Sequence, residues 1–213
     1  MKKIGILICI FLVGCASAST RITTFKDPKA NSYRRILVYA PVQSLEMQRV
    51  IETKFVEEIK QQGLYAIEYG KLFLPTREYS PKELVAIIKN NNFDGVLFFV
   101  GTDTGHTETY IPPTSTSKTQ GTLTPPIGKG QPWQYQAKTT QQQYGGYSIS
   151  KPWVYFRTQL FDYNLDQYVW IAEMETRGNG HATINTLIES AVSETIKKLI
   201  CDKLISAPYT PPR

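Results

Sequence analysis

Side chains that carry catalysis or bind metals are scarce in this chain. Its 213 residues include two histidines and three cysteines, and neither a phosphate-binding glycine loop nor a Gly-x-Ser-x-Gly nucleophile motif occurs. Asp103, His106 and Glu108 are close in sequence, but on a strand residues 106 and 108 share a face that 103 does not. We interpret them as polar positions at a strand end rather than as metal ligands or an acid/base cluster. The sequence therefore predicts a protein that is not an enzyme, with no catalytic residue, no cofactor and no metal site.

Apart from one run at the N-terminus, long apolar runs are absent as well. Two lysines follow Met1, and the apolar run Ile4–Val13 is much shorter than the ~20 residues needed to span a bilayer. This pattern predicts a removable leader rather than a membrane helix. The leader ends in Leu12-Val13-Gly14-Cys15, which resembles the lipobox of bacterial lipoproteins. The alternative is an ordinary secretory leader cleaved at the small residues Ala16-Ser17-Ala18.

The lipobox resemblance implies that residues 1–14 are removed and that Cys15 carries the lipid. Two or three acyl chains, at about 0.8 kcal/mol per buried methylene, make such an anchor nearly permanent. Ala16 stands where an inner-membrane retention signal has Asp, so the resemblance implies the outer membrane, with the domain facing the periplasm. The membrane is thus expected to be bound through the lipid on Cys15.

The scarcity of cysteine then excludes an internal disulfide. Cys9 leaves with the leader and Cys15 is acylated, which leaves Cys201 as the one free thiol. We expect Cys201 to be a packed, inert cysteine near a helix end; an intermolecular disulfide or a mixed adduct is the alternative.

Neither sign of charge dominates the chain. The formal charge falls from +6 to about +4 when Lys2 and Lys3 leave with the leader. This mildly basic balance is not the signature of a nucleic-acid binder, in which basic residues are massed on one face, so we expect no nucleic-acid partner.

Strand and helix patterns alternate in the first half of the chain. Arg35–Val42 is rich in β-branched residues and predicts a buried strand that Pro41 ends. Ser44 can cap the following helix, whose apolar residues recur every four positions before Gly63 ends it. The apolar residues of that helix are Met47, Ile51, Phe55 and Ile59.

A second strand, a second helix and a third strand follow. Leu64–Phe73 predicts the strand, and Ser80-Pro81-Lys82-Glu83 is a capping box for the helix. Val96–Val100 is a continuous apolar run, typical of a strand covered on both faces. The order strand, helix, strand, helix, strand indicates parallel pairing with right-handed crossovers. The buried face of the second helix is expected at Leu84, Val85, Ile87 and Ile88.

The C-terminal half predicts an antiparallel hairpin. Trp153–Phe161 and Val169–Thr176 alternate apolar and polar residues and are separated by turn residues. Their apolar faces share one core only if the residue numbers of each cross-strand pair add up to an even number. An even sum leaves an odd number of residues in the turn, which predicts a loop of three or five residues. The expected pairs are Phe156 with Met174, Leu160 with Trp170 and Arg157 with Glu173.

A last helix is expected to pack on the sheet. Its apolar stripe consists of Ile184, Ile188, Ala191, Val192, Thr195 and Leu199. Residues 34–206 therefore predict a single α/β domain of two or three layers, with a mixed sheet of about five strands, a βαβαβ first half, a hairpin and a C-terminal helix. The polar residues 15–33 predict a flexible tether that reaches roughly 20 to 25 Å, and 207–213 predict a disordered tail.

Residues 114–150 form a polar insertion rich in Thr, Gln, Ser, Gly and Pro. They lie in a stretch without any acidic residue between Glu108 and Asp162. A connection this long is functional or disordered, so we expect either a solvated loop or an arm that contacts a polymer, a glycan or an acidic protein patch. The candidate contact residues are Lys129, Trp133, Tyr135, Lys138, Tyr144 and Tyr147.

The succession of elements over residues 34–206 resembles small bacterial envelope lipoproteins with a compact α/β domain. Such domains occur in the Tol periplasmic protein, the curli-secretion lipoprotein and the activators of peptidoglycan synthases. The similarity rests on Arg35–Val42, on Phe93-Asp94-Gly95-Val96-Leu97 and on the hairpin from Phe161 to Ala172. It implies a non-enzymatic adaptor or assembly factor with a protein partner in the envelope.

Two other functions remain open from the sequence. A glycan- or solute-binding module would need a pocket lined by residues such as Trp133, Tyr144 and Trp153. An auxiliary subunit of an export or transport complex would bind membrane proteins.

Overall fold

A computed structural model describes the backbone of residues 16–124 and 134–206. The predictions for the leader at 1–14, for Cys15, Lys129 and Trp133, and for the tail at 207–213 fall outside the described residues. The chain divides into two compact units, one formed by residues up to Thr107 and from Lys151 onward, the other by 108–150. In chain order the elements are β1 (Ala18–Lys26), β2 (Arg35–Tyr39), α1 (Leu45–Gln61), β3 (Tyr65–Glu68), α2 (Tyr69–Leu72), α3 (Pro81–Asn90), β4 (Gly95–Ile111), β5 (Thr114–Thr124), β6 (Gln134–Tyr144), β7 (Tyr147–Asp162), β8 (Gln167–Gly178) and α4 (Ile184–Cys201).

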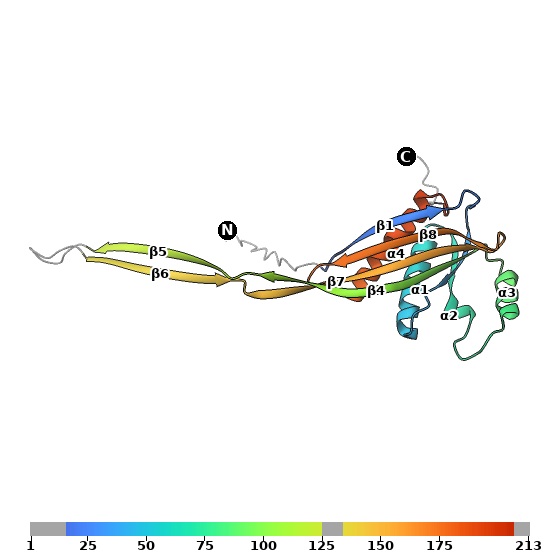
Figure 1. Ribbon diagram of the computed structural model, residues 1–213, viewed down its shortest axis with the longest axis horizontal. Coiled ribbons are helices and arrows are strands. Elements are labelled where there is room, and N and C mark those ends of the chain that lie inside the picture. Colours follow the sequence, from blue (N-terminus) through green and yellow to red (C-terminus); the bar gives the residue numbers. More distant parts are fainter. Residues whose placement is uncertain (1–15, 125–133, 207–213) are drawn as a thin grey trace, which may run out of the picture. The chain divides into compact units, whose positions relative to one another are not determined.

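The sheet of the first unit is mixed and has the strand order β1-β8-β7-β4-β2-β3 (Figure 1). β2 pairs parallel to both β3 and β4, whereas β8 pairs antiparallel to both β1 and β7. The predicted α/β class, the parallel first half and the C-terminal hairpin are therefore confirmed. The sheet has six strands instead of about five because β1 joins it.

β1 corrects the prediction of a flexible tether over residues 15–33. The strand runs antiparallel to β8 from the pair Ala18–Gly178 to the pair Lys26–Trp170. Alternate β1 side chains, Ile22 among them, pack toward the main core, while the positions between them are exposed. Ala18 and Ile22 are the apolar side chains of this strand that pack against the core, and its other apolar residue, Phe25, is exposed, so the sequence carries little apolar periodicity there.

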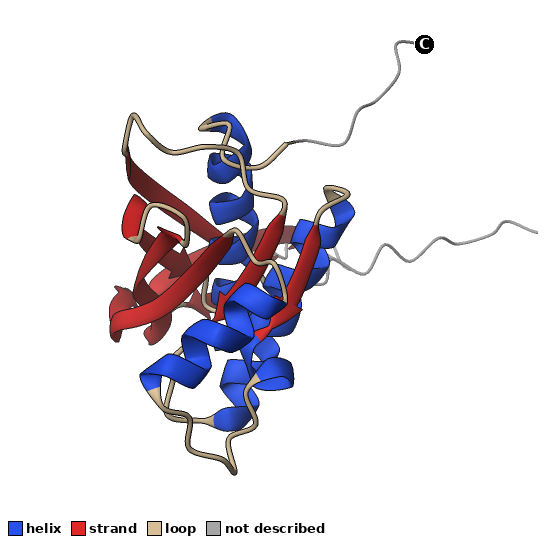
Figure 2. Cartoon of the chain, turned by 90° about the vertical axis from the view of Figure 1, so that its right-hand side faces the viewer, coloured by secondary structure: helices blue, strands red, loops and turns tan. Residues whose placement is uncertain are grey.

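Helices cover the sheet in two layers (Figure 2). Ile36 and Val38 of β2 belong to the main core, which also contains Phe55 of α1 and Ile188 of α4. Leu37 between them belongs to a smaller core that half-buried residues of α3 close. Because successive strand residues point to opposite faces, α1 and α4 lie on one side of β2 and α3 on the other.

Both predicted helix caps form. The Ser44 hydroxyl accepts a hydrogen bond from the Met47 N–H at 3.3 Å, and Ser80 and Glu83 form the reciprocal capping box. The predicted buried faces of α3 and α4 are each wrong at one residue. Val85 of α3 is 43% exposed, because only Leu84, Ile87 and Ile88 of this helix pack against the smaller core. Ile184 is 45% exposed as the first residue of α4.

The predicted strand over Leu64–Phe73 is too long. β3 ends at Glu68, and residues 69–72 form the short helix α2. The buried Glu52 carboxylate of α1 accepts a hydrogen bond from the Gly70 N–H at 3.1 Å, which holds the chain in the helical turn.

The hairpin register is confirmed at all three predicted pairs. Its loop is not odd, however, since four residues separate Asp162 from Gln167. The ladder shifts between Leu160 and Phe161, so that Val169 is an extra residue in β8. This bulge permits an even loop while both apolar faces stay on one core.

Candidate functional site

The second unit contains a sheet of its own, so β5 and β6 are not a solvated loop, and the alternative of a contact arm stays a prediction. β5 and β6 pair antiparallel along their whole length, from Thr114–Tyr144 to Thr124–Gln134 (Figure 1). We call residues 114–144 the polar ribbon. Threonine occupies five of the eleven positions of β5, and its branched Cβ favours extended backbone, which explains why this polar segment forms a strand. β6 has two threonines and two tyrosines among five glutamines.

The polar ribbon buries none of the side chains that the structure describes in it. Each described side chain of β5 and β6 is exposed, and one cross-strand hydrogen bond joins the hydroxyls of Thr119 and Thr139 at 3.0 Å. An isolated two-stranded ribbon is only marginally stable in water, because it has no apolar face to bury. Both outer edges, moreover, leave backbone N–H and C=O groups without a strand partner in the described part of the sheet.

The predicted contact residues do not form one cluster. Lys138 lies opposite Gln120, and Tyr144 lies on the same face of β6 but six residues farther along, about 20 Å at strand spacing. Tyr147 is 56% exposed at the start of β7. The backbone of Tyr135 pairs with that of Leu123, and Lys129 and Trp133 are outside the described residues. Lys118, which lies opposite Thr140 on the face of Lys138, is a contact candidate that sequence analysis did not select.

A proline pair and a glycine pair meet at the start of the polar ribbon. Pro112-Pro113 separates β4 from β5, and Gly145-Gly146 separates β6 from β7. The Gly146 N–H donates to the Ile111 carbonyl at 2.7 Å, and a Cβ on Gly145 would lie 2.2 Å from the Pro112 oxygen. Both glycines have positive φ, so this junction requires glycine for conformation and, at Gly145, for space.

A cleft of about 680 Å³ lies in the first unit, at the carboxyl ends of β2 and β3. We call it the aromatic cleft. One wall carries a row of four rings, with centroid distances of 4.0 Å from Tyr39 to Tyr69, 4.5 Å from Tyr69 to Phe73 and 5.3 Å from Phe73 to Tyr79. Its remaining lining residues are Leu45, Glu46, Gln48, Arg49, Glu52, Glu68, Gly70, Lys71, Leu74, Pro75 and Arg77.

Two buried carboxylates form the floor of the aromatic cleft. Glu52 accepts hydrogen bonds from the Ala40 N–H at 3.2 Å, the Gln48 amide at 2.8 Å and the Gly70 N–H. Burial raises the pKa of Glu52, and these three donors act against that rise. Glu68 is ion-paired with Lys71. Glu52 thus joins the end of β2 to α1 and α2, and Glu68 joins the end of β3 to α2.

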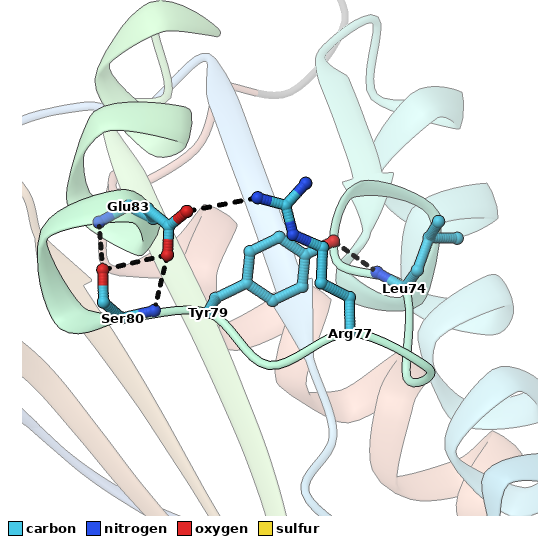
Figure 3. A network of polar contacts seen from close by, with 5 residues as sticks. All are labelled: Leu74, Arg77, Tyr79, Ser80 and Glu83. Carbon is cyan, nitrogen blue, oxygen red and sulfur yellow. Dashed lines mark hydrogen bonds and ion pairs between the residues drawn. The ribbon is translucent and has the colours of Figure 1, made fainter.

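The outer wall of the aromatic cleft is the loop between α2 and α3, which is fastened to α3 (Figure 3). Arg77 lies over the Tyr79 ring and donates to the Glu83 carboxylate at 3.1 Å. The Tyr79 hydroxyl accepts from the Leu74 N–H at 3.1 Å. Glu83 also accepts from the Ser80 N–H at 2.8 Å, and these hydrogen bonds hold the pKa of Glu83 below its ordinary value.

Sequence analysis missed this cleft because its residues come from separate elements. The signal that could have found it is positional, because Tyr39 ends β2 and Tyr69 directly follows β3, and open α/β sheets bind ligands at the carboxyl ends of their parallel strands. The predicted strand over Leu64–Phe73 hid this signal, since it placed Tyr69 within the strand. The pocket that the sequence associated with Trp133, Tyr144 and Trp153 stays a prediction, because Trp133 lies outside the described residues and Tyr144 and Trp153 belong to different units.

The other candidate residues are exposed and dispersed. Asp103, His106 and Glu108 are all exposed in β4, and no group of three His, Cys, Asp or Glu side chains suitable for a metal occurs among residues 16–124 and 134–206. Cys201 is exposed at the end of α4, so the prediction of a packed thiol is wrong. The helices within the described segments include none with the length and apolar character needed to cross a membrane.

Comparisons with known proteins identify no relative by sequence. No protein-family model and no curated protein matches the chain. Among solved structures, a single-residue variant of the PelC dodecamer from Paraburkholderia phytofirmans aligns with 84% of this chain and 98% of its own, at 9% identity and a TM-score of 0.49. The PelC dodecamer in another crystal form aligns with 87% and 98% at 10% identity and a TM-score of 0.46.

A third solved structure, a PDZ domain protein from Parabacteroides distasonis, aligns with 92% of this chain and 37% of its own at 10% identity, with a TM-score of 0.34. At these identities and TM-scores, the three alignments assign neither a family nor a function to this chain.

Proposed function

We propose that this chain is an outer-membrane lipoprotein, anchored through Cys15, that acts as a non-enzymatic adaptor or assembly factor, and that the polar ribbon binds its envelope partner. The observation that carries the proposal is the ribbon itself: an eleven-residue ladder with exposed polar side chains and two unpaired edges. The anchor at Cys15 rests on the lipobox resemblance.

Strand addition is the binding mode that the ribbon fits best. A partner that adds an extended segment to one edge would satisfy the unpaired backbone groups of that edge and turn two strands into three. Three strands with a covered face are stable where two are marginal. The energy of binding thus stabilises a segment that gains little from its own side chains.

The charges of the ribbon indicate the chemistry of the partner. Lys118 and Lys138 lie on one face, and no acidic residue occurs from 109 to 161. The complementary surface is therefore polar and acidic. A second copy of this face is disfavoured, because it would bring lysines against lysines.

The proposal is tested by in-cell photocrosslinking with the full, exported chain. A photoreactive residue replaces Gln120 or Gln142 in the ribbon, and a matched one replaces Glu57 on the exposed side of α1. We expect a defined adduct with an envelope protein from the ribbon positions alone, and we expect the double variant Lys118→Glu/Lys138→Glu to lose it. The matched variant Lys82→Glu/Lys89→Glu on α3 should keep it.

Two results would overturn the proposal. The first is equal crosslinking from Glu57 and from the ribbon, or no ribbon adduct other than a dimer of this chain. The second concerns the anchor: an exported Cys15→Ala form that folds, stays soluble in the periplasm and still forms the adduct at full yield would show that lipid on Cys15 is not needed.

A further inference from the structure

We propose that the aromatic cleft binds a short, uncharged saccharide. The cleft lies wholly within the first unit, and the proposal does not depend on the polar ribbon. Three properties of its walls support this ligand: exposed apolar groups at the mouth, charges that balance, and hydroxyl and guanidinium groups beside aromatic rings.

The mouth of the cleft exposes apolar side chains. Leu45 is 62% exposed at the start of α1, and Leu74 is 57% exposed on the facing loop. Together with the aromatic row, they make the lining mainly apolar. Its volume lies in the range of about 300 to 1,000 Å³ that is typical of small-molecule sites.

Most charges around the cleft are already satisfied within the chain. Lys71 is paired with Glu68, Arg77 is paired with Glu83, and Glu52 accepts three N–H groups. Among the described residues, Glu46, Arg49 and Glu52 are the charged lining side chains for which no ion pair forms. The acidic side chains Glu46, Glu52 and Glu68 and the basic side chains Arg49, Lys71 and Arg77 balance in formal charge. The cleft therefore offers no excess charge of either sign to attract an ionic ligand.

Polar groups remain available beside the rings. Tyr39 and Tyr69 present phenol hydroxyls at the edges of their rings, and Arg49 presents its guanidinium. Burial raises the pKa of Tyr69, so its hydroxyl keeps its proton and can donate at neutral pH. A sugar ring has an apolar C–H face and a rim of hydroxyls, which matches apolar and aromatic surface edged by donors and acceptors.

The cleft is preorganised for such a ligand. The hydrogen bonds at Leu74, Arg77, Ser80 and Glu83 fix the outer wall before any ligand arrives. A wall that is already ordered lowers the entropy lost on binding.

Saturation-transfer NMR and thermal shift on the folded protein test the proposal. The probes are the uncharged chitotetraose and cellotetraose, with tetragalacturonate as the charged comparison. We expect at least one uncharged probe to bind in the millimolar range or tighter, and tetragalacturonate to bind more weakly. Tyr69→Ala should weaken binding roughly tenfold, as expected for loss of an aromatic contact.

Rim variants keep the test independent of folding. Leu45→Ser/Leu74→Ser removes only exposed apolar groups and should weaken binding severalfold with little change in melting temperature. Leu165→Ser, at an exposed leucine in the β7–β8 turn, is the matched control and should bind like the unaltered chain. Deletion of residues 114–144 should also leave saccharide binding unchanged.

The proposal is overturned if neither uncharged probe binds, if tetragalacturonate binds as tightly as they do, or if the rim variant binds like the Leu165→Ser control. Loss of binding on deletion of the polar ribbon would place the site elsewhere. None of these results bears on the ribbon crosslinks, so the two proposals can fail separately.

Discussion

β1 and the polar ribbon are similar in composition but differ in what they pair with. Both are rich in Thr and Ser and contain lysine, and neither has an apolar run. β1 pairs with β8 and turns Ile22 toward the main core, and its Thr20 hydroxyl bonds those of Thr176 and Ser190. Within the described part of the polar ribbon, β5 and β6 pair only with each other. Whether a polar strand packs on the core or stays exposed therefore depends on the strand with which it pairs, and not on its composition.

Deletion of β1 and deletion of the polar ribbon should differ most in their effect on stability. A protein that starts at Asp27 loses the whole β1 ladder and uncovers the edge of β8, so we expect a loss of more than ~3 kcal/mol in the free energy of unfolding. Joining Pro113 to Gly145 removes the polar ribbon at a point where the two strands are close, since a Cβ on Gly145 would lie 3.2 Å from the Pro113 Cα. This deletion should shift the melting temperature by only a few degrees. Calorimetry of both deletions measures this, and equal destabilisation would break the comparison.

Amide hydrogen exchange should separate the same regions in the intact chain. The β1 amides that are hydrogen-bonded to β8 should exchange only when the first unit unfolds, so we expect them to be strongly protected. Amides of β5 and β6 should exchange orders of magnitude faster in the free protein, because no buried side chain holds that ladder together. Protection of the ribbon equal to that of β1 would show that it is stable without a partner.

Tyr33→Phe sharpens the comparison at the end of the N-terminal segment. The Tyr33 hydroxyl donates to the buried Asp162 carboxylate at 2.6 Å, so its removal should cost about 1 to 3 kcal/mol. Burial, and then the bond to Asp162, raise the pKa of Tyr33 above its ordinary value of 10.0. The unfolded chain therefore releases this proton at lower pH than the folded chain does.

It follows that the free energy of unfolding falls as pH rises above about 10, and that part of this fall disappears in Tyr33→Phe. Denaturant unfolding at neutral and alkaline pH measures both effects. An unchanged alkaline slope in the variant would contradict the assigned role of Tyr33.

A single side chain in β1 should give the smallest measurable effect. Ile22→Ser removes a half-buried aliphatic group from the main core and should cost about 1 kcal/mol in unfolding free energy. Thr23→Ser, on the exposed side of the same strand, is the control and should change stability by less than ~0.5 kcal/mol. Equal costs would mean that β1 is held by its backbone ladder alone.

The elements with strong periodicity were predictable, and those defined by their neighbours were not. The register of Phe156 with Met174 followed from the sequence, because a one-residue slip would turn an apolar face outward. The bulge at Val169 did not follow, since alternation is the same on either side of it. β1 was missed because threonine occupies two of its half-buried positions, so the strand has little apolar alternation. The aromatic cleft was missed because α1, α2 and a loop, which are separate in the sequence, supply its walls.

β1 also changes what the lipid on Cys15 would do. Only two residues lie between Cys15 and Ala18, and the three steps from Cys15 to Ala18 span about 10 Å when fully extended, so a lipid on Cys15 would hold the start of β1 near the bilayer surface. The hydrogen bonds from Tyr163 to Asp94 and from Thr104 to Trp153 show that β4 runs antiparallel to β7. Since β1 runs parallel to β7, and β2 and β3 run parallel to β4, the carboxyl ends of β2 and β3 lie at the same end of the sheet as the start of β1. If Cys15 carries the lipid, the aromatic cleft therefore lies at the end of the sheet that is nearer to the anchor.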